Sequence, residues 1–148
     1  MKKTAERSNE RNKTIKQTMT FKATPQEMYE IFMNSRKHTV ATGMKAKVSR
    51  RIGGKLSAGG GYISGENVEL VPDRKIVQRW RGEDWLEGHY SLASFVLVKV
   101  REGTKLKLTQ TGVPAEQFDN VSEGWHTFYW NPIAKWLETT SRQSIARK

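Results

Sequence analysis

The strongest constraint on the fold is a cluster of bulky apolar residues near the end of this 148-residue chain. They recur at steps of three and four, which is the period of one helix face. Burying so much aromatic surface requires a broad partner, so we expect this helix to lie across a sheet. Pro132 lies inside it and lacks the amide that would bond to the carbonyl of Phe128, which predicts a kink. The cluster consists of Trp125, Phe128, Tyr129, Ile133, Trp136 and Leu137.

The segment from 45 to 111 supplies the sheet. Short apolar runs there are separated by turns rich in glycine or containing proline, a pattern typical of consecutive antiparallel strands. An alternating run over 14–22 predicts an earlier strand. The segment 24–27, Thr-Pro-Gln-Glu, is a capping box, which predicts a helix that ends near Ser35, with a second short helix or a turn over 36–44. Gly65, inside a predicted strand, suggests a bulge or bend.

The expected fold class is therefore α+β. We expect a curved antiparallel sheet of about six strands wrapped around a long C-terminal helix, with one or two short helices after the first strand. The length fits one domain, predicted over 14–140, with a flexible basic leader over 1–13 and a flexible tail over 141–148.

Several classes of protein are excluded by composition. No run approaches the ~20 apolar residues of a membrane-spanning helix, and no apolar segment follows the N-terminal charges as in a secretory signal. The absence of cysteine excludes disulfides and thiolate chemistry. We expect a cytoplasmic protein with no membrane partner.

The net charge of +11 is concentrated in one block, because residues 31–65 hold seven cations and no carboxylate. Such a block attracts anionic partners. No aromatic residue lies between Met33 and Gly61, which disfavours a nucleic-acid platform, so we predict an acidic protein partner. The alternative is a solvated face that only maintains solubility. The predicted partner-binding residues are Arg36, Lys37, Lys45, Lys47, Arg50, Arg51 and Lys55.

Catalysis finds little support in the sequence. No histidine lies at metal-ligand spacing from another, so we expect no metal site and no cofactor. His89 could serve as an acid or base in a cavity, but a structural role is favoured. The glycines at 59–61 lack the Lys-Ser/Thr that a phosphate loop needs. We expect no enzymatic activity and no catalytic residue.

A cavity between sheet and helix is the other functional possibility, because a curved sheet facing one helix leaves space unless side chains fill it. A packed core is favoured, since large aromatic side chains usually fill such a space. A pocket for a small apolar ligand is the alternative. The candidate lining residues are Trp80, His89, Tyr90, Phe95, Trp125, Phe128 and Tyr129.

This order of elements resembles the helix-grip fold of the START-like superfamily. The segment 53–81, GGKLSAGGGYISGENVELVPDRKIVQRWR, is similar to the signature of the C-terminal domain of activators of the ATPase of the 90-kDa heat-shock chaperone. WLEGHYS at 85–91 and GW at 124–125 add to a resemblance that covers roughly 14–138.

The resemblance implies a co-chaperone that binds the 90-kDa heat-shock chaperone and modulates its ATPase. Two-domain members also carry an N-terminal domain, which we do not find in this sequence, so docking is expected more firmly than ATPase stimulation. The wider superfamily implies the alternative, a START-like carrier of a small apolar ligand.

Overall fold

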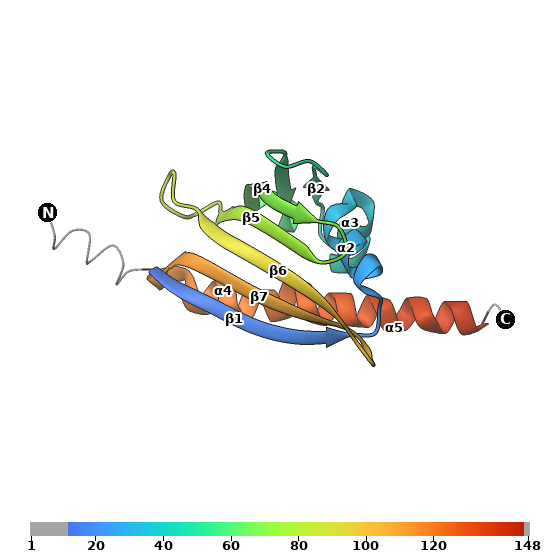
Figure 1. Ribbon diagram of the computed structural model, residues 1–148. Coiled ribbons are helices and arrows are strands. Elements are labelled where there is room, and N and C mark those ends of the chain that lie inside the picture. Colours follow the sequence, from blue (N-terminus) through green and yellow to red (C-terminus); the bar gives the residue numbers. More distant parts are fainter. Residues whose placement is uncertain (1–11, 147–148) are drawn as a thin grey trace, which may run out of the picture.

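Figure 1 shows the computed structural model, which describes the backbone of residues 12–146 and the side chains of residues 12–140. Seven strands form one antiparallel sheet in the order β1-β7-β6-β5-β4-β3-β2, and a long C-terminal helix crosses one face of it. The strands are β1 (Asn12–Phe21), β2 (Lys47–Val48), β3 (Lys55–Ala58), β4 (Ile63–Val71), β5 (Lys75–Gly82), β6 (Ser91–Val100) and β7 (Gly103–Pro114).

The predicted α+β architecture is confirmed, with differences at its edges. β1 begins at Asn12, so the predicted leader lies outside the described residues apart from 12–13. At the start of the predicted sheet segment, only Lys47–Val48 pairs with β3. Gly65 does not form a bulge, since the register shifts between Asn67 and Glu69 instead. A Cβ at Gly65 would lie 1.8 Å from the carbonyl oxygen of Arg79, so glycine permits close approach of the two strands.

Two short helices follow β1, α2 (Pro25–Met33) and α3 (Ser35–Thr42). The predicted capping box is present: the Thr24 hydroxyl accepts from the amide of Glu27 at 3.1 Å, and the Glu27 carboxylate accepts from the amide of Thr24 at 3.2 Å. The Asn34 side chain caps α3 by accepting from the amide of Lys37 at 3.0 Å. These caps satisfy amides that have no partner within the helix.

The C-terminal helix is continuous but not uniform. It consists of α4 (Phe118–Trp125), a π-helical turn η3 (His126–Trp130) and α5 (Asn131–Ala146), preceded by the 3₁₀ turn η2 (Ala115–Gln117). The amide of Asn131 donates to the carbonyl of His126, a five-residue step that widens the helix immediately before Pro132. α5 extends six residues beyond the predicted domain end at 140.

The π turn decides which aromatic side chains reach the core. Trp130, which the sequence pattern does not select, is 0% exposed, whereas Phe128, which it does select, is 51% exposed. Trp125 lies 5.3 Å from Trp130 and 4.8 Å from Tyr129 between ring centroids. Phe32 from α2 packs 4.9 Å from Phe95 of β6. The aromatic core therefore joins α2, the sheet and the terminal helix.

Candidate functional site

The seven predicted partner-binding cations lie along one edge of the molecule, which we call the basic edge. It comprises α3, the connection over 43–46, β2, the loop over 49–54 and β3, and β2 is the last strand of the sheet. All seven side chains are exposed. The members of the basic edge are Arg36, Lys37, Lys45, Lys47, Arg50, Arg51 and Lys55.

Asn67, which is 1% exposed, anchors the loop over 49–54 through hydrogen bonds. The Asn67 amide donates to the carbonyls of Ser49 at 2.7 Å and Arg51 at 3.0 Å. Its backbone accepts from Gly53 at 2.8 Å and donates to Gly54 at 2.9 Å. A loop fixed in this way presents its exposed side chains at little entropic cost on binding.

One cation of the basic edge is already neutralised. Arg50 forms a bidentate ion pair with Glu30 of α2, with N–O distances of 2.7 and 3.2 Å. The other six form no ion pair with another described residue. Those six therefore carry the charge that is available to a partner. Next to Arg51, Ile52 is 67% exposed and adds an apolar side chain to the same loop.

His38 of α3 and Tyr129 of the terminal helix form a buried pair that the sequence pattern does not reveal. His38 Nε2 lies 2.8 Å from the Tyr129 hydroxyl, and its Nδ1 lies 3.2 Å from the carbonyl of Phe32. A carbonyl can only accept, so Nδ1 carries the proton and Tyr129 donates to Nε2. Burial lowers the pKa of His38 and raises that of Tyr129. Both ring nitrogens of His38 and the hydroxyl of Tyr129 therefore have hydrogen-bond partners. The bond between the two side chains joins α3 to the terminal helix.

A pocket of about 520 Å³ opens between the terminal helix and strands β4 and β5, together with the turn that precedes β4. Four of the candidate cavity residues line it: Trp80, Trp125, Phe128 and Tyr129. The remaining walls come from residues that the sequence does not place there: Met44, Gly59, Tyr62, Ile63, Asn120, Val121, Glu123, Gly124 and Thr127.

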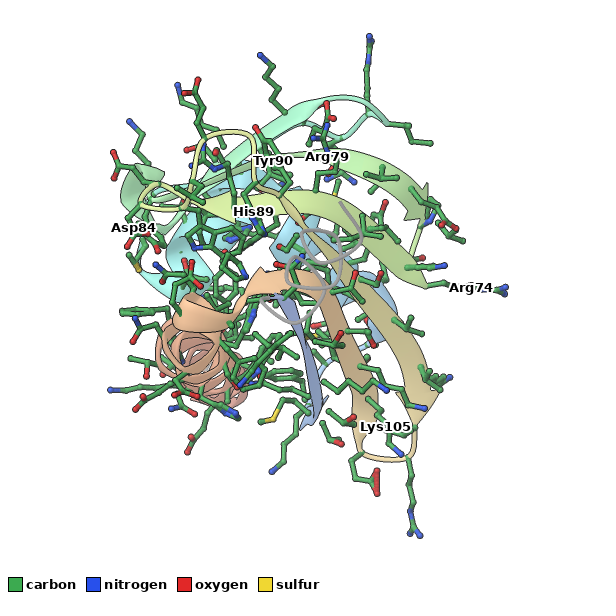
Figure 2. All side chains as sticks on the ribbon, turned by 90° about the vertical axis from the view of Figure 1, so that its left-hand side faces the viewer. Arg74, Arg79, Asp84, His89, Tyr90 and Lys105 are labelled. Atoms are coloured by element: carbon green, nitrogen blue, oxygen red, sulfur yellow. The ribbon has the colours of Figure 1, made fainter. Side chains whose placement is uncertain are left out.

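The other three candidate cavity residues lie elsewhere. Phe95 is 1% exposed and packs in the aromatic core. His89 Nε2 lies 2.9 Å from the carbonyl of Gly112, and its ring stands edge-on to Trp85. Tyr90 is 37% exposed and lies under the guanidinium of Arg79 at 4.4 Å, away from the terminal helix (Figure 2). His89 and Tyr90 therefore belong to the β5–β6 connection and not to the pocket.

At the mouth of the pocket, the Tyr62 hydroxyl donates to the carboxylate of Asp84 at 2.5 Å; Asp84 is labelled in Figure 2. Burial, together with this bond and the charge of Asp84, raises the pKa of Tyr62 to about 12. The tyrosine is therefore neutral at physiological pH and acts as a fixed donor. Tyr62 lies between the 3₁₀ turn η1 (Gly59–Gly61) and the start of β4.

Two further observations bear on function. Within residues 12–140, no group of three or more His, Asp or Glu side chains is placed to hold a metal ion. Among the described helices, none combines the length and apolar character needed to cross a membrane.

Comparison with known proteins identifies the family. Residues 22–138 match the family described as Activator of Hsp90 ATPase homolog 1-like protein. The human Activator of 90 kDa heat shock protein ATPase homolog 1 is 31% identical over 120 residues, which cover 81% of this chain and 35% of the relative. The corresponding homolog of Dictyostelium discoideum is 35% identical over 114 residues, 76% of this chain and 30% of the relative. The chain thus spans about a third of the length of these relatives.

Solved structures agree with this assignment. An HSP90 activator from Plasmodium falciparum superposes with a TM-score of 0.76 at 28% identity, covering 86% of this chain and 96% of that one. The Aha1 dimer from Colwellia psychrerythraea, at 16% identity and a TM-score of 0.67, shares the fold over 78% of this chain and 90% of that one. With the family match extending over most of the described residues, the chain belongs to the Activator of Hsp90 ATPase homolog 1-like family.

Proposed function

We propose that this chain is a non-catalytic co-chaperone module that binds Hsp90 through its basic edge and modulates the ATPase of that chaperone. The observation that carries the proposal is the family match over residues 22–138. The relatives named above are activators of the same ATPase. Because this chain corresponds to about a third of their length, binding is the first activity to test and ATPase modulation the second.

The basic edge is the favoured contact surface on physical grounds. Its six unpaired cations produce a local positive field, which speeds encounter with an acidic surface and makes binding salt-dependent. The loop over 49–54 is fixed by Asn67, so little conformational entropy is lost when it docks. Ile52 at the tip of this loop offers an apolar contact of the kind that is buried at the centre of interfaces.

Charge reversal tests the assignment. In the triple variant Lys45→Glu, Lys47→Glu and Arg51→Glu, the Arg50–Glu30 ion pair is kept. We expect weaker binding to purified Hsp90 and a flatter dependence of affinity on salt concentration. The matched control reverses three exposed lysines of the distant β1, β7 and β6 strands, Lys16, Lys107 and Lys99, which changes net charge equally.

The two variants give separable outcomes. Loss of Hsp90 binding only in the basic-edge variant supports the proposal. Equal affinity of that variant and the original chain at every salt concentration rejects the basic edge as the contact surface. An equal loss in both variants would mean that net charge acts without a defined surface. ATPase rates of Hsp90, measured with each variant at saturation, then test modulation separately from docking.

A second candidate function is carriage of a small apolar ligand, and the specific observation in its favour is the pocket of about 520 Å³. This volume falls within the usual range for ligand sites, ~300–1,000 Å³. The aromatic side chains therefore leave part of the interface between sheet and helix open. A ligand that binds only the folded state must raise the melting temperature, so a thermal-shift series with apolar ligands tests this function directly.

A further inference from the structure

The pocket beside the terminal helix presents aromatic rings whose polar hydrogens are mostly engaged elsewhere. Five of its lining residues are aromatic: Tyr62, Trp80, Trp125, Phe128 and Tyr129. Three of these five donate their O–H or N–H to residues that do not line the pocket, which are Asp84, His38 and Gln110. A ligand therefore meets the rings of these three side chains but cannot accept a hydrogen bond from them. The faces of such rings attract cations.

The charge at the pocket is negative, although the chain as a whole has a net charge of +11. Among the described residues, Glu123 is the only charged one that lines the pocket. It forms no ion pair with another described residue, so its carboxylate is available to a ligand. Arg81, which follows Trp80 in β5, lies on the opposite face of the sheet, where its guanidinium is 5.9 Å from the ring of Tyr90.

Two further carboxylates lie on the sheet side of the pocket mouth, next to Tyr62. The Tyr62 hydroxyl donates to Asp84, and the Tyr62 carbonyl accepts from the amide of Glu83 at 2.8 Å. Burial is the main cause of the raised pKa of Tyr62, and the charges of Asp84 and Glu83 add to it. Negative charge therefore reaches the mouth from the sheet side as well as from the helix.

On the helix side, Glu123 stands next to an aromatic ring. A Cβ at Gly124 would lie 3.6 Å from the Phe128 ring, so this ring covers the helix beside Glu123. Phe128 is 51% exposed, whereas Trp80 and Trp125 are 5% and 3% exposed. The pocket thus has a buried aromatic floor, and its rim holds a ring beside a carboxylate. Both rim groups attract an organic ammonium ion.

We infer that the pocket binds an amphiphilic organic cation, an alkylamine or alkylammonium ion with an apolar body. The body lies on the floor against Trp80 and Trp125, and the ammonium head lies at the rim beside Glu123 and Phe128. This inference rests on the second function proposed above and adds to it the class of ligand and its orientation.

The test compares three probes of equal chain length, decyltrimethylammonium, 1-decanol and decanoate, below their aggregation limits. Affinities are measured by isothermal titration calorimetry. For the original chain we expect decyltrimethylammonium to bind most tightly and decanoate most weakly. The net charge of +11 acting alone would give the reverse order, so tightest binding of decanoate would overturn the inference.

Glu123→Gln removes the charge at the rim and keeps the size of the side chain. We expect it to lower the affinity for decyltrimethylammonium about threefold to tenfold and to leave that for 1-decanol unchanged. The matched control is Glu102→Gln, which removes one charge in the turn between β6 and β7, outside the pocket. This control should leave both affinities unchanged.

Two variants test the placement of the head and the body. Phe128→Leu keeps an apolar side chain but removes the ring, so we expect decyltrimethylammonium affinity to fall about twofold to fivefold and 1-decanol affinity to change less. Thr127→Trp narrows the pocket from an exposed lining position, so we expect it to weaken both probes. Normal affinity for both probes in Thr127→Trp would overturn the placement in this pocket.

The outcomes separate this inference from the function on which it rests. If decyltrimethylammonium and 1-decanol bind the original chain equally, or if Glu123→Gln keeps its affinity for decyltrimethylammonium, the ammonium assignment is wrong and apolar carriage stands. If none of the three probes binds the original chain, both the carrier function and the inference are overturned.

Discussion

The indole N–H of Trp125 donates to the side-chain oxygen of Gln110 at 2.8 Å, which bonds the terminal helix to strand β7 inside the core. Gln110 is 0% exposed. Its amide donates to the hydroxyl of Ser91 at 2.9 Å, and Ser91 donates to the carbonyl of Trp80 at 2.7 Å. One chain of buried hydrogen bonds therefore links the helix to β7, β6 and β5, and it fixes the position of the helix on the sheet.

Replacing Gln110 by leucine should lower the free energy of unfolding. The change leaves the Trp125 N–H without its acceptor in a buried site, which costs about 1–3 kcal/mol in the free energy of unfolding. Trp130 forms the same kind of bond, since its indole N–H donates to the side-chain oxygen of Gln17 at 2.7 Å. Trp130 is 0% exposed, so Gln17→Leu should cost a similar amount. Urea denaturation measures both variants, and a loss below about 0.5 kcal/mol in Gln110→Leu would contradict the prediction.

His38 should make stability depend on pH. Burial lowers its pKa in the folded state, whereas in the unfolded chain the pKa is about 6.5. Between these values the unfolded chain binds more protons, so the free energy of unfolding falls as pH falls from about 6.5 toward the folded-state pKa.

We expect His38→Gln to lose less stability than the original chain between pH 7 and pH 5. The control, His126→Gln, changes an exposed histidine and should retain the original pH dependence. A pH dependence in His38→Gln equal to that of the original chain would contradict this assignment.

Asn67 should control the rigidity of the loop over 49–54. Asn67→Ala removes the side-chain donor to the carbonyls of Ser49 and Arg51. It also removes the acceptor for the side-chain amide of Gln78, which lies at 3.1 Å. We expect a loss of about 2 kcal/mol in the free energy of unfolding. Hydrogen exchange at the amides of Gly53 and Asn67 should also become faster.

Asn131→Ala serves as the control for this prediction. Asn131 is exposed on the terminal helix, so its replacement should change stability by less than about 0.5 kcal/mol. Unchanged hydrogen exchange in Asn67→Ala would show that the loop is held by its own backbone bonds alone. Reduced Hsp90 affinity in Asn67→Ala, with the cations intact, would connect loop rigidity to docking.

Two glycines should respond in opposite directions to alanine. At Gly65 a Cβ would lie 1.8 Å from the carbonyl oxygen of Arg79, so Gly65→Ala must separate β4 from β5 and should cost about 2–3 kcal/mol. At Gly124, inside α4, the nearest atom to an added Cβ is 3.6 Å away in Phe128. Gly124→Ala should therefore stabilise the protein by about 0.5–1 kcal/mol. Urea midpoints distinguish the two, and a stabilising Gly65→Ala would contradict the close strand contact.

Much of the fold follows from rules that act over a few residues. The capping box at Thr24, the alternating strands and the aromatic period of the last helix all depend on spacings of two to four residues, which a sequence displays directly. These spacings predicted the curved sheet and the helix across it, and the structure confirms both. The charge block was equally visible, because counting cations between 31 and 65 needs no coordinates.

The tertiary structure decided which side chains meet. The π turn at His126–Trp130 turns Trp130 inward and leaves Phe128 at the rim of the pocket, and a regular helical period cannot anticipate that extra residue. His38 and Tyr129, which are 91 positions apart in the sequence, form a hydrogen bond in the core. Outside that turn, the spacing of residues in the sequence is sufficient to predict most elements and their apolar faces, because those depend on local backbone geometry. Pairings between distant residues, and the space left beside them, emerge only when the elements pack.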